Sequence, residues 1–466
     1  MKKEAIELDA AALARRIAAG EQSAVEVVSA SLERIAATDI RVNAFTDLTH
    51  SRALAQAQSI DARRARGETL PLLAGVPYAV KNLYDIEGLT TRAGSKINRG
   101  LPAAGQDAVL VQQMQSAGAV LVGALNMDEY AYGFTTENSH DGPCHNPHDL
   151  NCIAGGSSGG SGAAVAAGQV PITLGSDTNG SIRVPASLCG VWGLKPTFGR
   201  LSRRGTYPFV HSIDHLGPFA NSVDGLALAY DALQTPDPLD PGCHALRIQP
   251  ASSHLNRGIE GLRIGVLGGY FHDHATPAAR EVVQRAAQAL GAIDEAIWPD
   301  AALGRTAAFI MTASEGGALH LDDLRTRPQD FEPLSVDRFI SGAIQPAAWY
   351  LRAQRFRRIY RDKINALFEH WDVLLCAATP VTAPRIGTEW LDVNGTRHPC
   401  RPAMGLLTQP VSFAGCPVVA APLWPDHSAL PLGVQLIAAP WREDLALRAA
   451  QVLSQAGVAY LKPPPL

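Results

Sequence analysis

Two turns rich in glycine and serine carry the clearest chemical signal in this sequence. The first, GGSSGGS, covers residues 155–161, and the second, SDTNGS, covers residues 176–181. Glycine tolerates unusual dihedral angles, so the backbone of such turns can approach a ligand closely. Ser181 ends the second turn, and we expect its hydroxyl to project into a cleft. Converging backbone amides could then hold a developing oxyanion, and they would belong to Thr178, Asn179, Gly180 and Ser181.

A serine hydroxyl is a weak nucleophile and needs a base. Lys81 is the residue that we expect to act as that base, because it ends the apolar run VPYAV and has no acidic residue within three positions. A buried lysine without an acidic partner is costly unless it gives up its proton. The neutral amine that results can accept a proton near neutral pH. The sequence therefore predicts acyl transfer by a serine with a lysine base.

Together these segments resemble the amidase signature family of hydrolases. The resemblance rests on AGVPYAVKNLYD around Lys81, on the two serine turns and on the GLKPTFGRLS that follows them. It extends through LVGALNMDEYAYG and VSFAGCPVVAAP, so it covers nearly the whole chain. It implies that Lys81 is the general base, that Ser157, held by a cis peptide bond, relays the proton, and that Ser181 is the nucleophile. No metal or other cofactor takes part in that mechanism.

The second turn departs from the family pattern at Asn179, where many relatives have glycine. Asparagine tolerates φ > 0, and we expect its side chain to enter the pocket and restrict the substrates. Three further segments resemble amidases of bacterial cyanuric acid breakdown that act on 1-carboxybiuret: TYPFVHSIDHLGPFA, DDLRTRPQDFEPLSVDRFISG and GTEWLDVNGTRHPCRPAMGLLTQPVSFAGCP. This implies hydrolysis of a small anionic amide with release of ammonia.

An anionic diamide would need an arginine or several amide donors in the pocket. The candidates are Tyr132, Arg183, His211, Arg401 and Gln409. Arg183 also has a purely structural interpretation, an ion pair with Asp177 that braces the turn, since buried arginine usually needs such a partner.

Other functions of the same class remain open. The chain could hydrolyse another small amide such as allophanate, or it could be an amidotransferase A-type subunit that obtains ammonia from glutamine. A scaffold subunit without activity is a third alternative, although all three residues of the triad are present. Because similar amidase subunits work with a small helical partner, the resemblance also implies a partner protein within a homo- or hetero-oligomer.

Two competing motif interpretations involve the same region. Residues 156–160 also satisfy the G-x-S-x-G elbow, which would make Ser158 the nucleophile and would need a late histidine such as His398 or His427. That elbow requires a strand directly before it, and HNPHDLNCIA is not typical of one. A phosphate-binding loop is disfavoured because G-x-x-x-x-G-K-[ST] is absent.

Two other polar clusters are better explained as structural. A metal site is conceivable where Cys144, His145, His148 and Asp149 crowd together, but a loop without a matching second half favours plain loop residues. Asp128 and Glu129 resemble a pair of catalytic carboxylates. Adjacent residues of a strand point to opposite faces, so we expect them to be structural as well.

Composition excludes several functional classes. The chain has 466 residues, of which 46% are hydrophobic and 18% charged, as is usual for a globular protein with a large core. The formal net charge of -4 argues against direct nucleic acid binding. Seven cysteines without a C-x-x-C pair indicate free thiols in a reducing compartment. With neither a signal peptide nor an apolar run long enough for a membrane span, we expect a cytoplasmic protein that does not contact membranes.

The alternation of helical and strand-like segments predicts an α/β fold. We expect an amidase signature α/β/α sandwich, in which helices cover both faces of a twisted mixed β-sheet. One domain spans residues 1–466. Helices are expected over 8–38 and 51–66, a loop over 143–162 and a last helix over 443–456. Within the domain we distinguish N-terminal helices (1–70), a catalytic core (71–235), an inserted helical and αβ region (236–370), and C-terminal strands with a helix (371–466).

Overall fold

Eleven strands form one mixed sheet in the computed structural model, which describes residues 9–466. Neighbouring strands are parallel in the groups β3-β2-β8 and β13-β11-β12, and antiparallel elsewhere. In their order across the sheet the strands are β1 (Phe45–Leu48), β3 (Val120–Leu125), β2 (Pro77–Lys81), β8 (Ile172–Asp177), β10 (His215–Ala220), β9 (Trp192–Lys195), β16 (Val418–Leu423), β17 (Leu432–Ala438), β13 (Val373–Ala377), β11 (Ile264–Leu267) and β12 (Asp294–Ala296).

Both faces of this sheet are covered. Every residue of β2, β8, β16 and β17 is buried, and successive side chains of a strand point to opposite faces. The predicted α/β sandwich with a mixed sheet is therefore confirmed. The helices are α2 (Ala10–Ala19), α3 (Ala24–Val42), α4 (His50–Ala65), α5 (Val109–Ser116), α6 (Gly159–Ala166), α7 (Arg183–Cys189), α8 (Val223–Ala232), α9 (Tyr270–Asp273), α10 (Pro277–Leu290), α11 (Ala301–Leu319), α12 (Leu321–Thr326), α13 (Val336–Ala343), α14 (Ala347–Leu367), α15 (Cys400–Ala403), α16 (Gln409–Ala414) and α17 (Glu443–Gln455).

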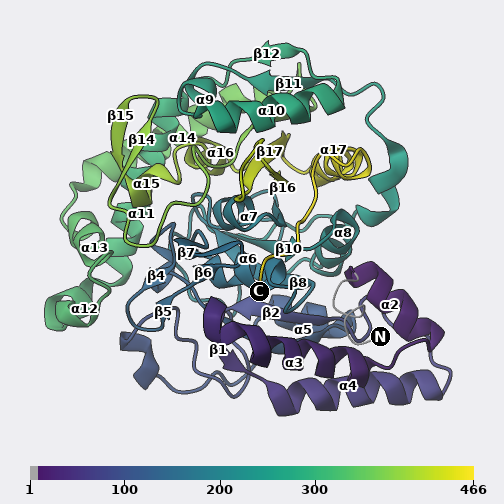
Figure 1. The fold of residues 1–466 in the computed structure, drawn as a ribbon. Coiled ribbons are helices and arrows are strands. Elements are labelled where there is room, and N and C mark those ends of the chain that lie inside the picture. Colours follow the sequence, from purple (N-terminus) through teal and green to yellow (C-terminus); the bar gives the residue numbers. More distant parts are fainter. Residues whose placement is uncertain (1–8) are drawn as a thin grey trace.

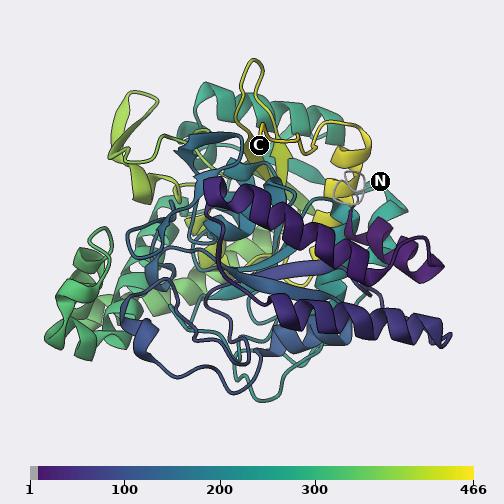
Figure 2. The same cartoon turned by 60° about the horizontal axis from the view of Figure 1, so that its bottom comes forward.

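The first strands of the chain lie at one end of the sheet and β11 and β12 at the other, while the C-terminal strands β16 and β17 lie between them (Figure 1). The purple helices α2, α3 and α4 lie at the end formed by β1 and β3, whereas α9 and α10 lie beside β11 and β12 at the opposite end. Figure 2 brings α3 and α4 forward. The helices α11 to α14 form a flank of their own, at the left of Figure 1. None of the helices within residues 9–466 is long and apolar enough to cross a membrane.

Two expectations about local structure were wrong. The helix expected over 8–38 is two helices, because Gly20 takes the left-handed conformation at the end of α2 and Ser23 begins α3 with a capping box. The loop expected over 143–162 contains the short strands β6 (His145–Asn146) and β7 (Asp149–Ile153), and α6 begins inside its glycine run. These glycines serve packing: a Cβ at Gly160 would lie 2.6 Å from backbone atoms of the neighbouring loops.

Candidate active site

The sheet brings the lysine and the second serine turn to the same edge. Lys81 is the last residue of β2, and the neighbouring strand β8 ends at Asp177, directly before the turn that contains Ser181. Because β2 and β8 are parallel, their carboxyl ends meet at one edge of the sheet. Ser157 reaches this edge from the loop before α6. Residues far apart in the sequence thus meet where the two strands end.

Lys81 contacts the serine that we expect to relay the proton. Its Nζ donates to Ser157 Oγ at 2.7 Å and to Ser176 Oγ at 2.9 Å. Lys81 and Ser157 are fully buried, and the peptide bond between Gly156 and Ser157 is cis, as the family resemblance implied. Ser176, which sequence reasoning did not single out, is thus a second hydroxyl that fixes the position of the amine.

Burial gives Lys81 the proton affinity that a base needs. Removal from water lowers the pKa of Lys81 from 10.5 to about 7, although the carboxylates of Asp128, Asp214 and Asp177 act in the opposite direction. None of these carboxylates forms an ion pair with the amine within residues 9–466. A substantial fraction of neutral amine is therefore present at neutral pH, which suits a general base.

Arg183 braces the nucleophile turn and does not line the cavity. Its guanidinium donates to Asp177 at 3.0 Å through both Nε and Nη2, and Nη1 donates to Gln435 Oε1 at 2.7 Å. The side chains of Arg183 and Asp177 are both fully buried. Burial alone would raise the pKa of Asp177, but Arg183 holds that pKa well below its usual value. The structural interpretation of Arg183 is confirmed, and direct substrate contact by this residue finds no support.

The turn leaves its backbone amides available. Within residues 9–466, no protein atom accepts a hydrogen bond from the N–H of Asn179, Gly180 or Ser181. Gly180 takes φ +141°, and a Cβ there would collide with Thr408 Oγ1, so this position requires glycine. Asn179, which could tolerate a positive φ, does not adopt one, and the positive φ of this turn is at Gly180. Such free amides at the end of a tight turn can stabilise an oxyanion.

A small cavity lies against Ser181. Among its lining residues are four predicted site residues, Tyr132, Thr178, Asn179 and Gln409. Buried polar atoms without a partner in the protein come from the same wall: Tyr132 Oη, Asn179 Oδ1 and Gln409 Oε1. The amide nitrogen of Asn179 donates to Thr312 Oγ1 at 2.8 Å, which leaves only the oxygen free. Buried polar groups are normally paired, so these atoms mark a surface that is complementary to a polar ligand.

Of two neighbouring arginines, Arg338 lines this cavity and Arg401 lies next to the lining residue Gly133; within residues 9–466, Asp128 is the only carboxylate paired with either. Arg338 lines the cavity, and its guanidinium lies 5.5 Å from the centre of the Tyr132 ring. Arg401 Nη2 donates to Asp128 Oδ1 at 3.0 Å, while its Nε and Nη1 are buried without a partner. Burial and the nearby charge of Arg401 lower the pKa of Arg338. The excess of positive charge suits an anionic group.

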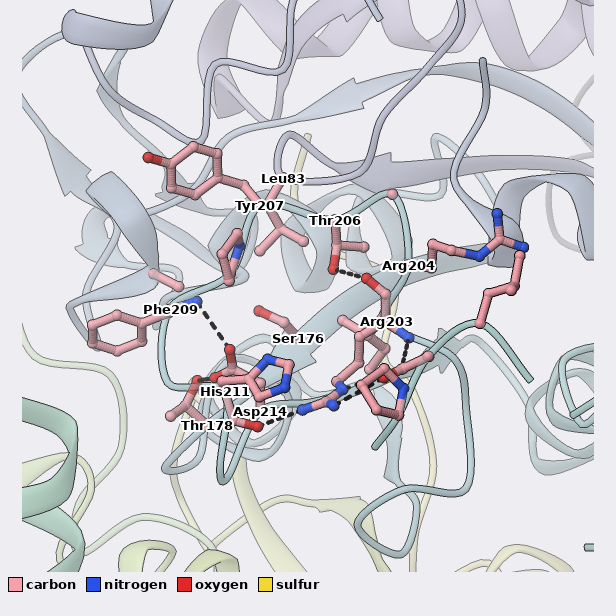
Figure 3. Close-up of a pocket in the computed structure, with 17 residues that line it drawn as sticks. Leu83, Ser176, Thr178, Arg203, Arg204, Thr206, Tyr207, Phe209, His211 and Asp214 are labelled. Atoms are coloured by element: carbon pink, nitrogen blue, oxygen red, sulfur yellow. Dashed lines mark hydrogen bonds and ion pairs between the residues drawn. The ribbon is translucent and has the colours of Figure 1, made fainter. Parts of the chain in front are cut away.

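A second and larger cavity of about 290 Å³ lies beside the catalytic centre (Figure 3). Ser176, Thr178 and His211 line it, whereas the other predicted pocket residues Tyr132, Asn179 and Gln409 line the smaller cavity instead. The cavity against Ser181 has only about 20 Å³, roughly the room of one water. We nevertheless assign the substrate to the smaller cavity, because Tyr132, Asn179 and Gln409 place unpartnered polar atoms there, whereas no buried unpartnered side-chain atom of residues 9–466 lines the larger one. Its walls must move apart when substrate enters.

The competing motif interpretations find no support in the geometry. Ser158 is fully buried and donates to Ser176 O at 3.1 Å, so its hydroxyl faces the sheet instead of a cleft. His145 Nδ1 lies 2.6 Å from Leu150 O, and His148 Nε2 lies 3.1 Å from Cys189 O. These histidines therefore interact with backbone carbonyls within the hairpin and with α7.

Comparison with known proteins agrees with this site. The profile of the Amidase family matches residues 26–447, which include all three residues of the triad and the cavity wall. This chain belongs to the Amidase family. The amidase is 73% identical to AtzE, the 1-carboxybiuret hydrolase subunit of Pseudomonas sp. (strain ADP), over 96% of this chain and 98% of that protein.

A more distant relative of this amidase is an amidotransferase subunit, and solved structures share its fold. It is 38% identical to the A subunit of the Glutamyl-tRNA(Gln) amidotransferase of Picosynechococcus sp., over 97% of this chain and 99% of that protein. Among solved structures, one described as "an unexpected vestigial protein complex" that "reveals the evolutionary origins of an s-triazine catabolic enzyme" superimposes with a TM-score of 0.97. The two chains share 71% identity, and the match covers 98% of this chain and all of that one.

Proposed function

We propose that this amidase hydrolyses the terminal amide of 1-carboxybiuret and releases ammonia. The observation that carries the proposal is the pair of guanidinium groups, Arg338 and Arg401, beside a cavity that Ser181 lines. In a substrate with a carboxylate at one end and a primary amide at the other, the carboxylate would lie at the guanidinium groups and the amide at Ser181. The identity of 73% to the AtzE hydrolase supports the same substrate.

Acylation uses the lysine and both serines. The neutral amine of Lys81 accepts the proton of Ser157 while Ser157 accepts the proton of Ser181. The Oγ of Ser181 forms a bond to the amide carbon, and the amides of residues 179–181 stabilise the oxyanion. The proton then returns through Ser157 to the leaving nitrogen, the carbon–nitrogen bond breaks and ammonia departs. Water attacks the resulting ester with the same base, which frees Ser181 and completes the hydrolysis.

The cavity wall suits the rest of the substrate. We assign the carboxylate to Arg338 and to the free Nε and Nη1 of Arg401, since planar guanidinium donors match a carboxylate. The N–H groups of the diamide can donate to Asn179 Oδ1 and Gln409 Oε1, two acceptors that have no partner in the protein. Tyr132 Oη is free to bind a substrate carbonyl.

Glutamine is a poorer fit than an anionic diamide. Its α-ammonium group would need an acidic partner, and no acidic residue lines the cavity within residues 9–466. The amidotransferase function therefore ranks second, although the chain is related to proteins with that function. We also propose that this amidase works with a partner protein. Its relative AtzE is named as a hydrolase subunit, and the solved structure with a TM-score of 0.97 is described as a complex.

Ammonia release tests the substrate. We would assay the wild-type chain on 1-carboxybiuret, biuret, allophanate and glutamine. Each assay would be run with and without a small helical protein co-expressed from the same organism. The expected result is preferential turnover of 1-carboxybiuret. Preference for glutamine would move the assignment to an amidotransferase, and preference for neutral biuret would remove the role of the arginine pair.

Three substitutions separate chemistry from recognition. Ser181→Ala should abolish turnover of every substrate, because no other residue forms the acyl-enzyme. Arg338→Met and Arg401→Met should raise KM for 1-carboxybiuret by about 10-fold to 100-fold each, the loss expected for a charge-assisted hydrogen bond. Full activity of Ser181→Ala on any substrate would overturn the triad, and an unchanged KM in both arginine variants would overturn the carboxylate site.

A further inference from the structure

The helix that carries Arg338 belongs to the peripheral flank of the molecule. Figure 1 shows α12 and α13 far from the sheet, so the position of Arg338 relative to Ser181 is not set by strand pairing. Arg338 lies in the first turn of α13, and within residues 9–466 no carboxylate or carbonyl accepts a hydrogen bond from its guanidinium. Another group must therefore fix the start of α13 if Arg338 is to face the cavity.

Glu129 is the group that makes this connection. Its side chain is fully buried in the turn after β3. The carboxylate accepts from the backbone N–H of Glu332 at 2.7 Å and from Ser335 Oγ at 3.2 Å, the residue directly before α13. It also accepts from Ser95 Oγ at 2.8 Å and lies 3.2 Å from His140 Nε2. One buried carboxylate thus joins the core to the start of α13.

The neighbouring carboxylate controls the second arginine. Asp128 accepts from Arg401 at 3.0 Å through Oδ1 and from the N–H of Thr136 at 3.0 Å through Oδ2. Three residues after Glu129 in the same turn, Tyr132 supplies the ring under Arg338. The turn of residues 128–132 therefore acts on both arginines. Asp128 binds the guanidinium of Arg401, and Glu129 binds the residues that precede α13, the helix that carries Arg338.

Aromatic packing also attaches α13 to the core, but it does not by itself set the direction in which Arg338 points. Phe339 of α13 is fully buried, with ring centres 4.9 Å from Tyr132 and 6.1 Å from Tyr130. The tight packing of α13 on α11 at Gly342 lies at the other end of the helix, so the first turn needs contacts of its own. The hydrogen bonds at Glu332 and Ser335 are directional, so they fix the direction in which the first turn presents Arg338.

We propose that Glu129 is a positioning residue for substrate selection: it fixes the start of α13 so that Arg338 stands opposite Arg401 across the carboxylate of the substrate. The inference rests on the proposed function, in which the two arginines bind that carboxylate. Glu129 does not line the cavity, and its carboxylate is occupied by the four contacts described above. It therefore acts through Arg338 and takes no part in proton transfer.

Glu129→Gln tests this role, because it keeps the volume of the side chain but turns one acceptor into a donor facing N–H and O–H groups. We expect KM for 1-carboxybiuret to rise at least tenfold while kcat falls less than threefold. The ratio of kcat/KM for 1-carboxybiuret to that for biuret should fall by a similar factor. Glu443→Gln is the matched control, since Glu443 at the start of α17 is also buried and accepts from the backbone N–H of Thr197, on the other side of the molecule from α13 (Figure 1), and it should leave this ratio unchanged.

A double-mutant cycle distinguishes positioning from general stabilisation. If Glu129 acts through Arg338, Glu129→Gln should add less than twofold to the loss of selectivity already caused by Arg338→Met. Should Glu129→Gln fail to fold, Ser335→Ala removes one of the same hydrogen bonds and should raise KM about twofold to fivefold.

The possible failures are distinguishable. Equal losses on 1-carboxybiuret and biuret, or effects of the two substitutions that multiply fully, would overturn the positioning role while leaving the arginine site intact. If Arg338→Met itself leaves selectivity unchanged, the carboxylate site of the proposed function fails, and the positioning role fails with it.

Discussion

Replacing Lys81, the proposed base, by methionine should stabilise this protein most at low pH. Lys81 is fully buried, and burial lowers its pKa to about 7 from the 10.5 of an exposed lysine. Between these values the unfolded chain binds a proton that the folded chain has released, so the wild-type protein becomes more stable as the pH rises through this window. Lys81→Met has no such proton and fits the apolar run VPYAV. Its stability should therefore lack this pH dependence.

The magnitude follows from the two pKa values. At 1.36 kcal/mol for each unit of pKa difference, retaining Lys81 destabilises the fold by about 5 kcal/mol well below pH 7. Loss of the hydrogen bonds to Ser157 and Ser176 offsets about 2 kcal/mol of the gain from methionine at every pH. Only the ionisation of Lys81 depends on pH. The difference in free energy of unfolding between Lys81→Met and wild type should therefore decrease by about 3 kcal/mol from pH 6.5 to pH 9.5.

Urea unfolding at pH 6.5 and pH 9.5, followed by tryptophan fluorescence, measures this difference. Lys363→Met is the control, because Lys363 is half exposed and paired with Asp300, and its effect should vary little between the two conditions. The same difference between Lys81→Met and wild type at both pH values, within about 1 kcal/mol, would refute the lowered pKa. The role of neutral Lys81 as the base would fail with it.

Three further predictions concern the same edge of the sheet. The kcat/KM of the wild-type enzyme should rise with pH and level off above an apparent pKa near 7, since only neutral Lys81 is a base; a profile that is flat from pH 6 to 8.5 would contradict this. Gly180→Ala should lower kcat at least 100-fold, because its Cβ would meet Thr408 Oγ1, and Thr408→Ala in the same chain should restore part of the loss. Arg183→Gln should lower the free energy of unfolding by about 3–5 kcal/mol, because the buried carboxylate of Asp177 loses its charged partner.

The arginine prediction has a matched control in the same fold. Arg204 also pairs with an aspartate, Asp237, but its side chain is 39% exposed. Arg204→Gln should therefore change the free energy of unfolding by less than about 1 kcal/mol. Equal effects of the two substitutions in urea unfolding would show that burial does not decide the strength of these pairs.

The surroundings of Lys81, Ser157 and Ser181, the residues of the proposed triad, were predictable because their requirements are local. Lys81 ends an apolar strand without an acidic neighbour, and the glycines around Ser157 and Ser181 mark turns whose backbones pack closely. The ion pair between Asp177 and Arg183 was also within reach, since six residues separate them on one turn. The mixed sheet followed from alternating strands and helices, although periodicity alone did not reveal the break at Gly20.

The arginines and polar residues around the small cavity were only partly predictable, because their arrangement depends on contacts between segments that are distant in the sequence. Asp128 and Arg401 are 273 positions apart, and nothing next to either residue indicates the other. Arg338 is one of many arginines in the helical flank, and only the fold singles it out. Ser176 resembles any polar residue near the end of a strand until Lys81 is placed beside it. His211 was chosen by residue type, and the structure places it at the neighbouring cavity.

The division of the site between two parts of the sequence bears on how such enzymes evolve new substrates. The groups that we propose for the chemical step lie between residues 81 and 181, whereas the two guanidinium groups come from residues 338 and 401. Mutations or recombination in the later codons can therefore change which charged group the enzyme selects, while Tyr132 and Asn179 keep their places in the cavity wall. The inherited acyl-transfer apparatus stays intact throughout, so intermediates on that path need not lose the ability to turn over an amide.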